Sequence, residues 1–193
     1  MKKFILASAS PRRKEILQNA GFSFEIIVSD ADENITESLT PSETVEELAK
    51  RKAMAVWKNN KDAVVFGCDT VVAVDGKILG KPVDDEDAFA MIKMLSGKVH
   101  TVSTGVCICD ADKISVFSNT TEVEFYPLSD ETIRSYIATG EGKDKAGSYG
   151  IQGYGCVLIK EIKGDYFSVM GLPVSESARV LADFGVYGKV AVN

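Results

Sequence analysis

Hydrophobic positions along the chain occur as short apolar runs separated by segments with helical spacing. The longest run, Ala63–Val74, predicts a buried strand, and the Asp75-Gly76 pair after it predicts a tight hairpin turn into residues 77–80. The other apolar runs are Phe4–Ala7, Phe22–Val28, His100–Cys109, Ile114–Phe125, and the two that flank a Lys163-Gly164-Asp165 turn, Val157–Ile162 and Tyr166–Val169. The pattern therefore predicts several strands, some of them paired through hairpins.

Helix signals lie between these runs. Thr40-Pro41-Ser42-Glu43 is a capping box with proline at the first helical position, and it predicts a helix that runs to about Asn59. The other predicted helices are Pro11–Ala20 with Gly21 past its end, a segment from Asp84–Asp87 to Ser96-Gly97, one from Ser129 to near Gly140, and one from Leu172-Pro173 to Gly185. Because strands and helices alternate irregularly, we expect an α/β fold with a mixed twisted sheet and flanking helices.

The composition narrows the class of protein. The 193 residues allow one large domain or two small lobes, and 45% apolar residues suffice for a proper core. No run approaches the ~20 apolar residues that span a bilayer, and the first apolar stretch is too short for a signal peptide. We therefore expect a cytoplasmic protein that does not bind membranes. A net charge of −6 argues against a nonspecific nucleic-acid binder but leaves room for a basic pocket that takes a small anion.

The cysteines do not indicate a metal site. The chain has four cysteines, no C-x-x-C pair and a single histidine, His100, so neither a zinc site nor a disulfide framework is expected. Cys107 and Cys109 lie two apart in an apolar run, and we expect both to be reduced thiols in the core.

The first apolar run is followed by small hydroxyl residues, a proline and two arginines, an order that predicts a strand, a tight loop and a helix N-terminus. Ser10 is a good N-cap, and Pro11 fits the first helical position. A helix N-terminus attracts anions, and Ser8, Arg12 and Arg13 add hydroxyl and guanidinium donors that suit phosphate oxygens. Taken alone, the segment fits an ordinary capped helix with solvated arginines slightly better.

Three charged residues interrupt the apolar pattern or follow it closely. Asp69 lies inside the longest apolar run, where a carboxylate is costly unless it is paired or bound to metal. A bulge at Gly67 would turn it outward, but the run is long on both sides and favours a functional role. Lys52 lies on the apolar stripe of its helix, where snorkelling past the core edge and a role in a site are equally good interpretations. Lys81 follows Gly80, which allows a ligand to approach the backbone, although solvated loop lysines are commoner.

One carboxylate and several cations on different elements are the composition of a site for a polyphosphate and a divalent cation. Magnesium or manganese would be held by carboxylates and phosphate oxygens, and arginine and lysine would neutralise the phosphates. A carboxylate near the metal can also orient and deprotonate water.

The chain resembles the Maf family of nucleotide pyrophosphatases, the septum-formation-inhibitor-like proteins. The resemblance begins with Leu6-Ala7-Ser8-Ala9-Ser10-Pro11-Arg12-Arg13. Further blocks follow in the family's order over nearly the whole chain: Gly67–Val72, Ile78–Pro82, Leu95–Gly97, His100–Val106, Asp144–Gly153 and Met170–Pro173. So many blocks in one order are not a chance match.

This resemblance implies one domain over residues 1–193, with two lobes around a cleft, related to inosine triphosphatases. It implies hydrolysis of a nucleoside triphosphate between the α and β phosphates, with Mg²⁺ or Mn²⁺ as cofactor. Asp69 would accept the proton of the attacking water and, with Glu33, would hold the metal. The implied phosphate contacts are Ser8, Arg13, Lys52 and Lys81. Family members are often dimers, which makes a homodimer an assembly to test.

The resemblance also bears on base specificity. Members that act on dTTP and UTP share Arg12, Thr70 and Gln152 with this chain, whereas the branch that acts on 7-methyl-GTP differs at these places. The Gln152 amide offers a donor and an acceptor, which suit a 4-oxo group and N3–H. We therefore favour dTTP and UTP, with modified uridine triphosphates as possible extras. The chain departs from the family at Gly142, where tryptophan is usual, and at Ser168, where asparagine is common; both concern the cleft wall.

Two other functions compete with this one. A nucleotide-binding regulator of cell division would bind without significant turnover, and a phosphatase would release orthophosphate. A carboxylate in a buried strand favours catalysis over binding alone, because a negative charge near phosphates weakens anion affinity. The identity of the product separates the two enzyme hypotheses.

Overall fold

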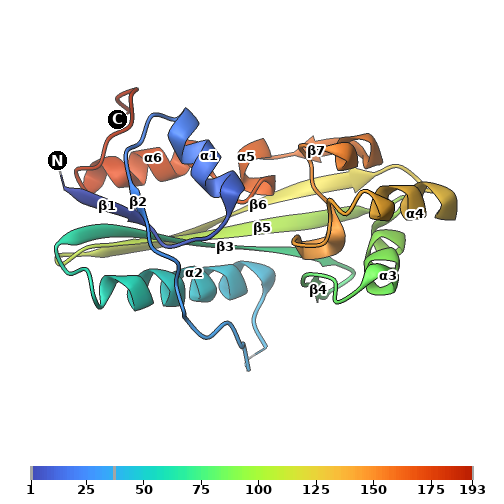
Figure 1. The fold of residues 1–193 in the computed structure, drawn as a ribbon, viewed down its shortest axis with the longest axis horizontal. Coiled ribbons are helices and arrows are strands. Elements are labelled where there is room, and N and C mark those ends of the chain that lie inside the picture. Colours follow the sequence, from blue (N-terminus) through green and yellow to red (C-terminus); the bar gives the residue numbers. More distant parts are fainter. Residues whose placement is uncertain (1, 37, 193) are drawn as a thin grey trace. The chain divides into compact units, whose positions relative to one another are not determined.

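The computed structural model describes residues 2–36 and 38–192, whose strands form one mixed sheet accompanied by helices (Figure 1). The strands are β1 (Lys3–Leu6), β2 (Glu25–Ile26), β3 (Ala63–Val74), β4 (Lys77–Leu79), β5 (Val99–Cys109), β6 (Ile114–Phe125) and β7 (Ile159–Lys163). The helices are α1 (Pro11–Asn19), α2 (Pro41–Trp57), α3 (Asp85–Leu95), α4 (Asp130–Ala138), α5 (Tyr166–Val169) and α6 (Val174–Asp183), with two 3₁₀ segments, η1 (Ala146–Ser148) and η2 (Tyr154–Leu158). Within the described residues, no helix combines the length and the apolar character that crossing a membrane requires.

The sheet mixes parallel and antiparallel pairs. Its strand order is β2-β1-β3-β5-β6-β7, and β4 pairs with β3 beside this path. Strand β1 runs parallel to both β2 and β3, whereas β4 lies antiparallel to β3 and β7 antiparallel to β6. The α/β fold with a mixed sheet and flanking helices, expected from the alternation of apolar runs, is thereby confirmed.

The chain divides into two compact units. The first unit comprises Met1–Asp69, Thr104–Asn119 and Gly171–Asn193, and the second comprises Thr70–Ser103 and Thr120–Met170. The long strands β3, β5 and β6 each contribute residues to both units. The boundary in β3 falls between Asp69 and Thr70, two residues that the sequence assigned to one site.

In the first unit, helix α2 packs on the sheet at two glycines. A Cβ on Gly67 would lie 2.3 Å from the carbonyl oxygen of Ala49, and a Cβ on Gly105 would lie 2.3 Å from that of Val45. Because any side chain at either glycine would collide with the helix backbone, these glycines allow α2 to approach β3 and β5 closely. The apolar residues buried beneath the helix include Cys107, which is a free thiol, as is Cys109. The expectation that both cysteines lie in the core is confirmed.

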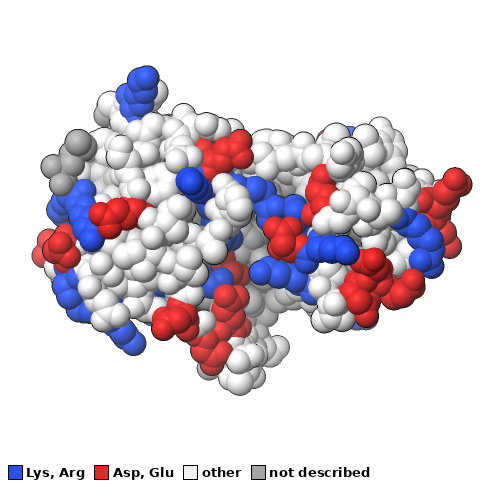
Figure 2. All heavy atoms as spheres, in the orientation of Figure 1, with Lys and Arg blue, Asp and Glu red and all other residues white. Residues whose placement is uncertain are grey.

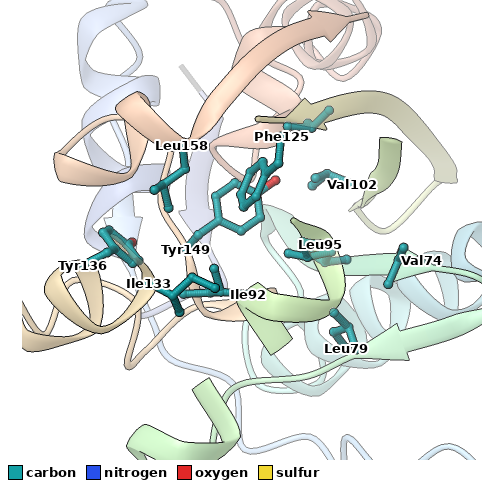
Figure 3. Packing of buried hydrophobic residues seen from close by; sticks show 12 residues of the cluster. Val74, Leu79, Ile92, Leu95, Val102, Phe125, Ile133, Tyr136, Tyr149 and Leu158 are labelled. Atoms are coloured by element: carbon teal, nitrogen blue, oxygen red, sulfur yellow. The ribbon is translucent and has the colours of Figure 1, made fainter. Parts of the chain in front are cut away.

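The second unit has its own apolar core, drawn in Figure 3, around Tyr149 and Phe125. Their rings pack edge to face with centroids 4.7 Å apart, and the ring of His100 completes the group at 5.0 Å from Phe125. Nε2 of His100 and the hydroxyl of Tyr149 lie 2.7 Å apart in a buried hydrogen bond. This packing fixes Tyr149, and with it the start of the segment that carries Gln152.

The structure departs from the sequence pattern in three elements. The Tyr166–Val169 run forms helix α5 because the Asp165 side chain caps it, accepting a hydrogen bond from the backbone N–H of Phe167 at 2.8 Å. Strand β7 begins at Ile159 rather than at Val157, because η2 extends to Leu158. The predicted strand at 22–28 is reduced to two residues, which pair with β1 alone.

The two departures from the family lie in tightly packed places. A Cβ on Gly142 would lie 2.0 Å from the carbonyl oxygen of Ser148, so no side chain fits there in this backbone conformation. Ser168 is fully buried in α5. Glycine at position 142 therefore allows the backbone there to lie against the carbonyl group of Ser148.

Candidate active site

Asp69 lies inside strand β3, as the apolar pattern predicted, and its side chain is only 12% exposed. Its Oδ1 accepts a hydrogen bond from Nζ of Lys52 on helix α2 at 2.6 Å. The Lys52 side chain is 14% exposed and ends at this carboxylate instead of snorkelling into solvent. The close approach of α2 to β3 at Gly67 brings this buried ion pair together.

Glu33 reaches the same lysine from the acidic loop before α2. Its Oε1 lies 3.1 Å from Nζ of Lys52, and its own side chain is 63% exposed. The loop is held by Arg51, whose Nη1 donates to the carbonyl oxygen of Asn34 at 2.8 Å. Lys52 thus stands between two carboxylates. Arg51 was missed by the sequence reasoning, and its position next to Lys52 on the same helix is the signal that could have found it.

The N-terminus of helix α1 has the predicted cap. The Oγ of Ser10 accepts a hydrogen bond from the backbone N–H of Arg13 at 3.4 Å, and Pro11 occupies the first turn. The buried hydroxyl oxygen of Ser8 accepts from the backbone N–H of Ser10 at 3.2 Å and from Nη1 of Arg13 at 3.1 Å. The arginine is therefore fixed at the helix N-terminus, where backbone donors already favour an anion.

A backbone carbonyl joins this helix end to strand β3. The carbonyl oxygen of Gly171 accepts hydrogen bonds from Nε of Arg13 at 2.8 Å and from Sγ of Cys68 at 3.1 Å. Burial raises the pKa of Cys68 to about 11, so the thiol keeps its proton and acts as a donor at neutral pH. Since Cys68 precedes Asp69, this carbonyl links the arginine to the strand that carries the carboxylate. The sequence motif contains Gly171, but a backbone oxygen has no sequence signature of its own.

The remaining predicted site residues are distributed over both units. Arg12 is half-buried in α1 of the first unit. In the second unit, Thr70 is half-buried in β3, Lys81 is exposed after β4, and Gln152 is exposed between η1 and η2. The loop before Lys81 is tied to η1, because the backbone N–H of Gly147 donates to the carbonyl oxygen of Gly80 at 3.0 Å. Within the first unit, Arg13 contacts Ser8, and Lys52 contacts both Glu33 and Asp69.

Two carboxylates are available to a metal ion here. Within the described residues, no three His, Cys, Asp or Glu side chains gather in a way that could hold one. Asp69 and Glu33, however, both converge on Nζ of Lys52. A magnesium ion that is bound together with a nucleotide takes one or two carboxylates, phosphate oxygens and water. The pair of carboxylates therefore fits a divalent cation that is shared with phosphates.

Charged side chains are mixed over the surface shown in Figure 2. Lysine and arginine are interspersed with aspartate and glutamate on this face, and they form no single broad basic area there. The chain as a whole carries a net charge of −6, so attraction of a small polyanion would fall to individual cations such as Arg13 and Lys52.

Together, a carboxylate held by a lysine, a second carboxylate on the same lysine, and an arginine anchored at a helix N-terminus are the polar groups that this α/β fold assembles in its first unit. The sequence matches the family model described as Maf-like protein over residues 3–184, and the chain belongs to this family. The family resemblance predicted from the sequence motifs is confirmed.

Individual relatives are similar over almost their whole length. The dTTP/UTP pyrophosphatase of Bacillus pumilus (strain SAFR-032) is 50% identical over 96% of this chain and 98% of its own. The dTTP/UTP pyrophosphatase of Bacillus cereus (strain ATCC 10987 / NRS 248) is 51% identical over 96% of this chain and 92% of its own. Among solved structures, the Staphylococcus aureus Ham1 protein matches with a TM-score of 0.49 and 18% identity, over 64% of this chain and 72% of that one. This last likeness is too distant to add to the family match.

Proposed function

We propose that this chain hydrolyses dTTP and UTP to the nucleoside monophosphate and pyrophosphate, with modified uridine triphosphates as further substrates. The observation that carries the proposal is the Asp69 carboxylate, held inside a buried strand by Lys52 at 2.6 Å and linked through Gly171 to an anchored arginine. Relatives about half identical over nearly the full chain are named for activity on these two nucleotides.

The proposed chemistry is a displacement at the α-phosphorus. The water oxygen forms a bond to this phosphorus, the bond to the oxygen bridging the α and β phosphates breaks, and its electron pair leaves with pyrophosphate. Asp69 takes the proton from the water as general base. The ammonium group of Lys52 fixes the direction of the carboxylate, so that the water is placed in line with the leaving group.

The main barrier to attack is the negative charge of the triphosphate. Ser8, Arg13, Lys52 and Lys81 are the proposed phosphate contacts, and their donors offset this charge. Arg13 is already immobilised by Ser8 and by the carbonyl oxygen of Gly171, so it loses little conformational freedom when it binds phosphate.

Asp69 and Glu33 would hold the divalent cation, Mg²⁺ or Mn²⁺. When bound, such an ion neutralises phosphate charge and polarises phosphorus–oxygen bonds. Glu33 is exposed and lies on a loop, so it is the carboxylate of the pair that can adjust to the incoming nucleotide.

Base selection is proposed for Arg12, Thr70 and Gln152. An exposed amide such as that of Gln152 can donate to the 4-oxo group and accept from N3–H of thymine or uracil. A single domain over residues 1–193 with two lobes around a cleft, a cytoplasmic location and a homodimer remain predictions of the sequence.

The test is release of pyrophosphate from a panel of nucleoside triphosphates with magnesium or manganese, using the intact chain and Asp69→Asn. Selective turnover of dTTP and UTP that is lost in the variant supports the proposal. Turnover of 7-methyl-GTP alone would overturn the base specificity and leave the chemistry standing. Orthophosphate as the product would favour a phosphatase, and binding without turnover would favour a nucleotide-binding regulator.

A further inference from the structure

Glu141, just after helix α4, is the centre of a hydrogen-bond cluster in the second unit. Its Oε1 accepts from the hydroxyl of Tyr136 at 3.1 Å and from the backbone N–H of Gly155 at 3.0 Å. Its Oε2 accepts from the backbone N–H of Tyr154 at 2.5 Å. One carboxylate therefore binds two consecutive backbone donors of a distant segment, and hydrogen bonds to an ionised acceptor are stronger than neutral ones.

Tyr136 extends this cluster to the other side of Gln152. Its hydroxyl oxygen accepts from the backbone N–H of Gly150 at 3.0 Å while the same hydroxyl donates to Glu141. The ring of Tyr136 belongs to the apolar core shown in Figure 3, so the hydroxyl is presented from a fixed base. The pair thus holds the backbone two residues before Gln152 and again two residues after it, while Gln152 itself is exposed.

The backbone of this segment lies close to the carboxylate of Glu141 and to itself. A Cβ on Gly153 would lie 2.0 Å from Oε2 of Glu141, closer than any real contact. A Cβ on Gly155 would lie 2.2 Å from the carbonyl oxygen of Gly150, which closes the loop on itself. With the Glu141 carboxylate in its present place, Gly153 leaves room for it, and Gly155 leaves room for the backbone at Gly150.

We infer that Glu141 is a positioning residue for base recognition, which acts by fixing the backbone from which Gln152 presents its amide. This inference rests on the proposed activity on dTTP and UTP. A segment that is ordered before the nucleotide binds has no ordering entropy to lose on binding. If the segment is released, binding of the base should weaken and the preference for one base over another should decrease. The reaction at the phosphates should be unaffected, because other residues carry it.

A purely structural role for Glu141 makes a different prediction. It would lower the stability or the folded fraction, and the folded molecules that remain would keep their KM and their preference among bases. Two measurements separate the two roles: the change in KM compared with the change in kcat, and the ratio of kcat/KM for UTP to kcat/KM for CTP. The second reports on base recognition, because CTP carries an amino group where UTP has the 4-oxo group.

The test uses Glu141→Gln in the intact chain, with pyrophosphate release as the assay. The substitution replaces one acceptor oxygen by an NH₂ group that must face a donor, so at least one of the three contacts is lost. We expect KM for dTTP and UTP to rise about tenfold and the preference for UTP over CTP to fall about tenfold, with kcat within about twofold, as for loss of a hydrogen bond to a charged group. Glu131→Gln, at an exposed site on α4, makes the same charge change and should match the wild type.

Tyr136→Phe provides an independent variant that keeps the ring in the core. It removes the link to Gly150 and should shift KM and the base preference in the same direction. If Glu141→Gln does not fold, Tyr136→Phe decides: a shift supports the inference and unchanged values overturn it. Wild-type KM and base preference in folded Glu141→Gln would overturn the inference and leave the proposed function standing. A wild-type chain inactive on both dTTP and UTP would overturn both.

Discussion

Replacing Asp69 with asparagine removes one negative charge at almost constant size. In the wild type, Nζ of Lys52 lies 2.6 Å from Oδ1 of Asp69 and 3.1 Å from Oε1 of Glu33. The asparagine oxygen can still accept from Lys52, so the side chain at position 69 should stay in place. The amide cannot take a proton from water, so the variant removes the proposed general base while it leaves the structure around position 69 in place.

The expected magnitudes follow from this environment. General-base catalysis contributes about 10²–10⁴ in rate, so kcat should fall by that factor, equivalent to about 3–5 kcal/mol in the barrier. Removing one partner of a buried ion pair costs about 3–5 kcal/mol of stability. Lys52 keeps Glu33 and an amide oxygen as partners, and both members of the pair retain some exposure. We therefore expect a smaller loss in the free energy of unfolding, about 1–2 kcal/mol.

The assay compares pyrophosphate release and urea unfolding for Asp69→Asn and a matched control, Asp110→Asn. Asp110 is also a largely buried carboxylate of the first unit, 2.9 Å from Nζ of Lys2, and it has no proposed part in the site. The control should lose stability but keep kcat. More than a tenth of wild-type turnover in folded Asp69→Asn, or an equal loss of turnover in Asp110→Asn, would refute the reasoning.

Three further predictions concern binding, pH and thiol reactivity. Arg13→Ala should lower kcat/KM for dTTP about 10–100-fold in steady-state kinetics, through loss of charge-assisted hydrogen bonds to phosphate. An unchanged kcat/KM would show that the Arg13 side chain only ties Ser8 to Gly171. Burial lowers the pKa of His100 to about 4 from an ordinary 6.5, so below pH 6.5 the unfolded chain takes up a proton that the folded state does not. Stability should be full above pH 6.5 and fall by about 3 kcal/mol by pH 4; urea unfolding should show a smaller loss for His100→Gln, and an equal loss would contradict this origin. Cys156 is exposed and the other three cysteines are buried, so one thiol per native chain should react rapidly with a thiol reagent, and fast reaction of two or more would contradict the packing.

Local signals in the sequence were sufficient for several parts of the structure. The Ser10 cap with Pro11 and the capping box at Thr40 formed as predicted, because capping depends on residues three apart in the chain. The Asp75-Gly76 turn has positive φ at both residues, 50° and 75°, which is the backbone this pair favours. Strand β3 has the predicted bounds because its twelve residues are almost all apolar.

Other parts depended on contacts between residues far apart in sequence. Tyr166–Val169 has an apolar composition typical of strands but is helical, and its cap residue Asp165 is held by Thr121, whose Oγ1 accepts a hydrogen bond from the backbone N–H of Asp165 at 2.9 Å. Glu33 lies in a polar loop that the sequence pattern alone would leave in solvent, and only the fold brings it to Lys52 on α2. The segment around Gln152 was irregular in the sequence, and its path is set by the carboxylate of Glu141.

By itself, the sequence determined the α/β class, the family, and the presence of a carboxylate that an apolar strand would not otherwise contain. Those properties depend on periodicity, local capping and motif order, all of which can be read along the chain. The tertiary structure alone decided what pairs with that carboxylate, what anchors Arg13 and what holds Gln152. The decisive groups are a lysine ammonium seventeen residues from Asp69, the carbonyl oxygen of Gly171 and the backbone N–H groups of Tyr154 and Gly155. Backbone donors and acceptors are common to every residue type, so their roles become visible only when folding has fixed their positions.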